Sequence, residues 1–307
     1  MPLNSCFRPL FCLYWYPYMD GPLENTEMGA VAGPIEKKPS ITGLEVVSAG
    51  LGNKLFSPKD ILGKDQGSVI KSPVIVSQNG LGFLETHGNM ISRIDEGLAG
   101  LIFGERPLGI DSEVDLGEMA RIRYLTSGVS SDAFVLEVGD EKFVLKTKRR
   151  SEGRSAWQPY TKEMLQAQTV ARDLAGVLDK EKVHLPEFMF ASDEVSCARL
   201  ESGEQPQQMS ELSAVTTVAK KLREYMNKRR GFEDLWKNVY LDISINKGPY
   251  GDEVVQVLQR DVLKRPDGSY VWIDPFVHGV STEPAPDSRS WWRRALAPKG
   301  KKYDYSG

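Results

Sequence analysis

The chain has 307 residues, of which 40% are hydrophobic and 26% are charged, and 39 Lys+Arg against 42 Asp+Glu leave a formal net charge of −3. This composition is typical of a globular chain that buries a sizeable core. Proteins that bind nucleic acid through its phosphates are normally more basic, and no run of about 18 uninterrupted apolar residues occurs. We therefore expect neither a nucleic-acid partner nor a membrane partner.

The cysteines and histidines exclude two further classes of protein. The only cysteines are Cys6, Cys12 and Cys197, and they show no CxxC spacing. A zinc ribbon and a disulfide framework both need closer or paired cysteines. The three histidines form no HExxH pattern, which disfavours a histidine-rich metal centre. Cysteines without a framework fit a reducing compartment, so we predict a cytoplasmic protein.

The two ends of the chain differ from its middle. Residues 1–43 combine an aromatic start with a Gly- and Pro-rich stretch, which predicts a disordered or linker arm. Its aromatic start is either a membrane-interface anchor or sequence upstream of a natural start at Met19 or Met28, and we prefer the second interpretation. Residues 281–307 predict a flexible tail. The alternative for that tail is a nucleic-acid contact through residues 291–294, WWRR.

Residues 44–118 carry short apolar pieces that are interrupted by glycine. This punctuation predicts a small β-rich accessory segment of short strands and turns, not of long helices. Asn79-Gly80 has the composition of a hairpin turn.

The stretch from 119 to 280 begins with three alternating runs, which predict three antiparallel strands. The turn between the first two strands contains Gly128, Ser130 and Ser131, and Lys146 lies near the end of the third strand. Small residues let backbone N–H groups approach phosphate oxygens, and a nearby lysine supplies a compact positive charge. The pattern therefore suits a phosphate site, although a plain β-meander explains it equally well.

A helix is predicted over residues 159–178, and Glu163 lies in its first turn. A glutamate at this place can pair with Lys146 and aim its ammonium group at phosphate. The alternative is that Glu163 only complements the helix dipole.

The remaining pattern consists of two strands, a linker, an amphipathic helix over 210–231 and a hairpin around Pro266-Asp267-Gly268. Asp274 directly follows the last strand of this hairpin. A carboxylate at a strand end is a suitable hard oxygen ligand for Mg²⁺, and an ordinary strand-end aspartate is the alternative.

In its order of elements, the stretch 119–280 resembles the protein-kinase-like fold, in its compact bacterial and aminoglycoside-phosphotransferase-like forms. The resemblance implies an α+β, two-lobed fold with a β-rich N-lobe and a mainly helical C-lobe, which uses ATP and Mg²⁺. By the same resemblance, Gly128 to Asp132 covers the phosphates, Phe143 to Lys146 is the VAIK-type strand and Glu163 is the helix partner of Lys146. Asp274 stands at the DFG position as a metal ligand, and Ala191 to Glu204 is the hinge that receives adenine.

The sequence departs from the family at the catalytic loop, where no HRD or HGD motif is found. One register puts Asp261 at the place of the metal-binding Asn, but it leaves Gln256 where the catalytic Asp belongs. A second register takes Asp242 as the base and Asn246 as a metal ligand, and it requires an insertion over 247–252. We prefer Asp242 as the base, with Asp261 as a weaker metal candidate.

These features together predict an atypical kinase that binds ATP·Mg²⁺ and transfers the γ-phosphoryl group to an unidentified hydroxyl of a small molecule or a protein. Lys146, Glu163 and Asp242 would carry the catalysis. If neither catalytic register holds, the chain is a nucleotide-binding pseudokinase with a regulatory role. A third interpretation is a structural or interaction protein that binds no nucleotide.

Overall fold

The computed structural model describes residues 41–63, 67–104, 107–117, 119–127, 131–148, 159–229, 233–237, 239–247 and 253–278. Most of the predicted arm, the turn residues Gly128 and Ser130, and the whole tail 281–307 lie outside the described residues. In the described ranges, none of the helices has the length and apolar composition needed to cross a membrane.

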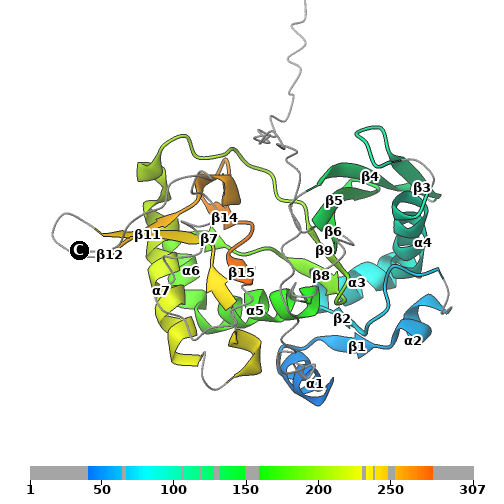
Figure 1. Cartoon of the computed structure of the whole chain (residues 1–307), viewed down its shortest axis with the longest axis horizontal. Helices are drawn as coiled ribbons and strands as arrows, with labels where there is room; N and C mark the ends of the chain where they lie inside the picture. Colours follow the sequence, from blue (N-terminus) through cyan, green and yellow to red (C-terminus); the bar gives the residue numbers. More distant parts are fainter. Residues whose placement is uncertain are drawn as a thin grey trace, which may run out of the picture. The chain divides into compact units, whose positions relative to one another are not determined.

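A single antiparallel sheet of eight strands dominates the first part of the chain (Figure 1). The predicted three-strand meander is part of this sheet, and Gly139 makes the tight turn between the second and third strands of the meander with a φ of +57°. Glycine adopts this backbone region without the steric cost of a Cβ. In spatial order the strands are β1 (Lys54–Phe56), β2 (Val74–Val76), β8 (Phe188–Ala191), β9 (Val195–Arg199), β6 (Glu141–Lys148), β5 (Ser131–Val138), β4 (Ala120–Ser127) and β3 (Glu113–Gly117).

Residues 44–118 contribute β1, β2 and β3 to this sheet, but they also form helices that the sequence did not predict. These are α1 (Ile41–Gly50), which begins just before the segment, α2 (Pro58–Leu62), α3 (Gln78–His87) and α4 (Met90–Ile102). The buried faces of α3 and α4 form a first hydrophobic core with the inward residues of the sheet.

The predicted hairpin turn at Asn79-Gly80 is wrong, because both residues lie in the first turn of α3. The hydroxyl of Ser77 caps this helix by accepting a hydrogen bond of 2.9 Å from the N–H of Gly80. Gly80 also packs against strand β8, since a Cβ there would lie 1.9 Å from the carbonyl oxygen of Met189. Glycine at position 80 thus serves close helix–strand packing.

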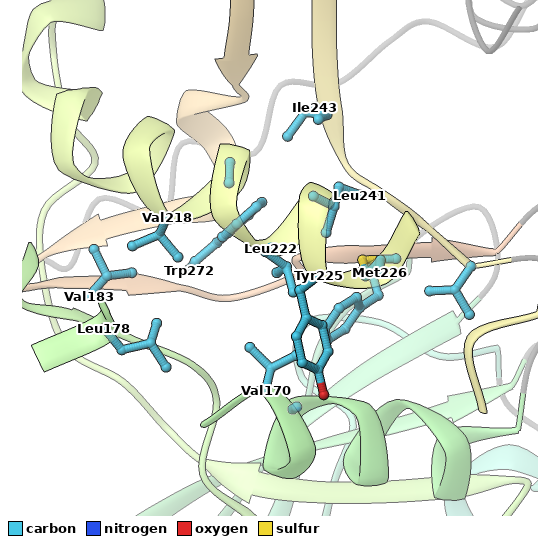
Figure 2. Close-up of a cluster of buried hydrophobic side chains, with 14 of the residues drawn as sticks. Val170, Leu178, Val183, Val218, Leu222, Tyr225, Met226, Leu241, Ile243 and Trp272 are labelled. Carbon is cyan, nitrogen blue, oxygen red and sulfur yellow. The ribbon is translucent and has the colours of Figure 1, made fainter. Parts of the chain in front are cut away.

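A second hydrophobic core lies around three helices, α5 (Tyr160–Asp173), α6 (Ala175–Glu181) and α7 (Ser213–Arg229). Figure 2 shows Val170 of α5, Leu222 and Tyr225 of α7 and Trp272 of a small sheet meeting in one cluster. The Tyr225 hydroxyl donates a hydrogen bond of 2.6 Å to Asp173 at the end of α5, which ties α5 to α7.

Three small sheets complete this second core. In the first, β14 (Tyr270–Trp272) lies between β13 (Val262–Lys264) and β7 (Val183–His184). The second pairs β10 (Val239–Leu241) with β15 (Phe276–His278). The third is a hairpin of β11 (Ile243–Lys247) and β12 (Glu253–Val257). Short 3₁₀ turns lie at Met209–Leu212, Asp234–Trp236 and Gln259–Asp261.

The expected α+β architecture is confirmed. The structure contains the predicted order of meander, helix with Glu163, two strands, long helix and hairpin before Asp274. The β11–β12 hairpin stands between β10 and β13, where the second register of the catalytic loop requires extra residues.

Candidate functional site

Lys146 lies on β6, between β5 and β9, where it is paired with Ala133 and Ser196. Phe143 and Leu145 of the same strand are buried in the first core. Because side chains alternate along a strand, Lys146 projects from the opposite face of the sheet.

The charged partner of Lys146 is Asp274, which comes from the loop after β14. The Lys146 Nζ lies 3.5 Å from Asp274 Oδ2, and the two side chains are 25% and 49% exposed. The negative charge of Asp274 is the main cause that raises the pKa of Lys146 above its ordinary value, against the opposing effect of burial. Lys146 is therefore a firmly protonated cation.

Glu163 lies in the first turn of α5, as predicted, and its charge also raises the pKa of Lys146. Burial raises the pKa of Glu163 itself to about 7, with Asp274 adding to the rise and Lys146 opposing it. In the described part of the chain, the ion pair of Lys146 within 4.0 Å is with Asp274, not with Glu163. Glu163 thus raises the pKa of Lys146 by its negative charge, without forming an ion pair with it.

Two residues beside Lys146 were missed by the sequence reasoning. Lys148 lies two positions along the same face of β6, with its Nζ 5.9 Å from the centre of the Tyr160 ring. Burial lowers the pKa of Lys148 and raises that of Tyr160, and a hydrogen bond with Ser131 opposes the rise for Tyr160. Ser131 is the first residue of β5, so it lies next to the predicted phosphate-covering turn.

Asp242 directly follows β10. Its position is fixed by the pairing of β10 with β15, the strand that begins two residues after Asp274. The Asp242 N–H donates a hydrogen bond of 3.0 Å to the carbonyl of Pro275. Asp242 is only 7% exposed, and its Oδ1 is buried without a hydrogen-bond partner. Burial raises the pKa of Asp242, and the charge of Arg260 opposes this rise.

Asp261 lies next to Asp242, in the turn that precedes β13. Its carbonyl accepts a hydrogen bond of 2.8 Å from the N–H of Ile273, the residue before Asp274. Burial, followed by the charge of Asp242, raises the pKa of Asp261 to about 8. The guanidinium of Arg260 faces both carboxylates, with Nη2 3.6 Å from Asp242 Oδ2 and Nε 3.5 Å from Asp261 Oδ1.

The donor set here is chemically suited to a hard divalent cation. Asp242 Oδ1 and Asp261 Oδ2 are buried oxygens without a hydrogen-bond partner, and their repulsion is what a bound cation relieves. The described side chains contain no group of three or more His, Cys, Asp or Glu already arranged to hold a metal ion. The carboxylates are thus neighbours, but they do not form a closed cage.

The role of Asn246 as a metal ligand stays a prediction. Asn246 is four positions beyond Asp242 in β11, where its backbone pairs with Val254.

The predicted hinge, Ala191 to Glu204, includes the end of β8, all of β9 and the segment after it. Glu204 exchanges two backbone hydrogen bonds with Lys264 of β13, of 2.9 and 2.8 Å. This segment therefore links β9, which lies beside β6, to β13, which follows Asp261. Its contact with adenine stays a prediction.

No protein-family model matches the chain. A search of the curated proteins also gives no match.

Among solved structures, a streptomycin–ATP ternary complex of APH(2")-IIa matches with 14% identity over 52% of this chain and 67% of that chain, at a TM-score of 0.26. Rv3197 from Mycobacterium tuberculosis, in complex with erythromycin, matches with 11% identity over 65% and 60% of the two chains, at a TM-score of 0.28. The Rio2 kinase–ADP/Mg²⁺–phosphoaspartate complex from Chaetomium thermophilum matches with 14% identity over 67% and 56%, at a TM-score of 0.25. The chain thus spans between 56% and 67% of the length of these three structures.

Proposed function

We propose that the chain is an ATP-dependent phosphotransferase that moves the γ-phosphoryl group of ATP to a hydroxyl of a small molecule or a protein. The observation that carries this proposal is the 3.5 Å pair between Lys146 and Asp274, next to the buried carboxylate of Asp242. A fixed cation beside aspartates on a separate element is the arrangement that phosphoryl transfer needs for charge neutralisation and positioning.

In this proposal Lys146 binds the α- and β-phosphates, and Glu163 holds its ammonium group in place. The turn that contains Gly128, Ser130 and Ser131 covers the phosphates with backbone N–H groups. Asp274 and Asp261 hold Mg²⁺, which supplies charge neutralisation on the phosphate oxygens when bound.

Asp242 is the proposed base. Its carboxylate orients the acceptor hydroxyl and takes the proton, while the hydroxyl oxygen bonds to the γ-phosphorus and the bond to the departing ADP oxygen breaks. The raised pKa of Asp242 suits this role, because a more basic carboxylate takes a proton more readily. The cysteine usage favours a reducing compartment, and we place this activity in the cytoplasm.

One observation favours the second candidate, a nucleotide-binding pseudokinase. The guanidinium of Arg260 lies 3.6 Å from Asp242, where its positive charge weakens the carboxylate as a base. In that case the chain binds nucleotide for a regulatory purpose and transfers no phosphoryl group.

The variant Asp242→Asn separates the two candidates. If Asp242 is the base, ADP release falls by about 10²- to 10⁴-fold, while the Kd for ATP·Mg²⁺ stays close to that of the wild type. The matched control is Asp179→Asn, because Asp179 is an exposed residue of α6. Unchanged ADP release in Asp242→Asn contradicts the assignment of the base. Nucleotide binding without any turnover in the wild type supports the pseudokinase.

A further inference from the structure

Arg260 is a cation that the proposed chemistry does not yet use. It lies in the turn Gln259–Asp261, and its guanidinium is close to one oxygen of Asp242 and one oxygen of Asp261. In the described ranges of the chain, it is the cation that pairs with these two carboxylates. Its side chain is nevertheless 65% exposed.

The two carboxylates do not use up the hydrogen-bonding capacity of Arg260. Its distances to Asp242 and Asp261 are 3.6 and 3.5 Å, which exceed the 2.7–3.2 Å range of N–H···O hydrogen bonds. A guanidinium carries five N–H donors in a rigid plane and binds carboxylates and phosphates in a bidentate manner. Arg260 therefore has donors for one further anion.

The location of this cation decides which anion it meets. Lys146 and Asp274 form their pair at the sheet, where the nucleotide phosphates are proposed to bind. Arg260 pairs instead with Asp242, the proposed base, which touches the acceptor. Asp242 is buried and the arginine is exposed, so an approaching acceptor meets a positive group beside the base.

We infer that Arg260 determines acceptor specificity by binding a carboxylate or phosphate group that the acceptor carries a few bonds from its reacting hydroxyl. The substrate class is thus an anionic hydroxyl compound, such as a hydroxy acid or a phosphorylated polyol, and polycationic acceptors are disfavoured. This inference rests on the proposed function, because it takes Asp242 as the base.

The first test measures anion binding without turnover. Inorganic phosphate is titrated calorimetrically into the full chain and into Arg260→Gln, Arg260→Lys and Lys146→Ala, with Arg172→Gln as the charge-matched control. Arg172 is suitable because it is 55% exposed and pairs with its neighbour Asp173 on α5. We expect Arg260→Gln to weaken phosphate binding at least about tenfold, Arg260→Lys to restore part of it and Arg172→Gln to retain it, while Lys146→Ala reports the phosphate that binds at the nucleotide site.

Two results of this titration overturn the inference. One is that Arg260→Gln binds phosphate as the wild type does while Lys146→Ala does not, which places the anion at the nucleotide site alone. The other is that phosphate binds to none of the proteins.

The second test compares matched acceptors in an ADP-release assay, with glycerol against glycerol 3-phosphate and D-glycerate. We expect the anionic compounds to stimulate ADP release more than glycerol, and Arg260→Gln to raise their KM at least about tenfold without changing the Kd for ATP·Mg²⁺. Equal or stronger stimulation by glycerol overturns the inference. If Arg260 binds phosphate but no compound releases ADP, the proposed transferase function fails and the anion site stands.

Discussion

The backbone N–H of Asp242 donates a hydrogen bond of 3.0 Å to the carbonyl oxygen of Pro275. Pro275 directly follows Asp274, and the ladder between β10 and β15 continues this contact through Leu241 and Phe276. The proposed base and the proposed metal ligand are thus held on adjacent strand ends. Since Asp274 also pairs with Lys146, one short network joins the sheet, the base and the metal ligand.

The first prediction concerns Asp261. Asp261→Asn keeps one oxygen ligand and removes one of the two neighbouring carboxylate charges, so we expect the Mg²⁺ concentration for half-maximal ADP release to change only a few-fold. Asp261→Ala removes the ligand, and we expect this concentration to rise by about tenfold or more. A Mg²⁺ titration of ADP release measures both. Equal behaviour of Asp261→Ala and the wild type would contradict the role in metal binding.

The second prediction is a dependence of stability on pH that arises from Glu163. Burial raises its pKa from 4.5 to about 7, so the folded protein binds more protons than the unfolded chain between these values. The contribution of Glu163 to the free energy of unfolding is therefore full below about pH 4.5 and falls as the pH rises to about 7. Glu163→Gln stays neutral, so we expect its stability relative to the wild type to increase over this range and to level off above it.

Urea denaturation of both proteins at pH 5, 6, 7 and 8 measures this difference. A difference that is constant with pH would show that Glu163 ionises alike in the folded and unfolded states.

The third prediction tests the packing of α3 against β8. Gly80→Ala places a Cβ 1.9 Å from the Met189 carbonyl oxygen, and we expect it to lower the free energy of unfolding by about 1–3 kcal/mol. The control is Gly82→Ala in the same helix, where a Cβ meets nothing within 4 Å. Alanine is the better helix former, so this control should be neutral or stabilise by up to about 1 kcal/mol. If both variants lower the free energy of unfolding by the same amount, the close contact with Met189 is not the reason that position 80 is glycine.

The elements that local patterns define could be predicted from the sequence. The alternation around Lys146, the helical spacing after Glu163 and the strand before Asp274 all depend on neighbours within a few residues. Each of these elements is present in the structure.

The contacts between distant segments could not be predicted in this way. Asn79-Gly80 is a hairpin signal when it is read locally, but the cap from Ser77 and the contact with Met189 make it helical. The β11–β12 hairpin separates Asp242 from Asp261 along the chain, and their proximity depends on backbone hydrogen bonds with Pro275 and Ile273, the two neighbours of Asp274. For this reason the sequence left two registers for the catalytic loop, and it gave no role to Arg260.

The central claim is that Lys146 and Asp274 form an ATP·Mg²⁺ site, and a thermal-shift titration tests it most directly. ATP is added with and without Mg²⁺ to the wild type, to Lys146→Ala and to Lys142→Ala. Lys142 lies on the same face of β6, but it pairs with Glu137. We expect a Mg²⁺-dependent rise in Tm for the wild type and Lys142→Ala, and its loss in Lys146→Ala. No rise in any of the proteins, or an equal rise in Lys146→Ala, would contradict the account.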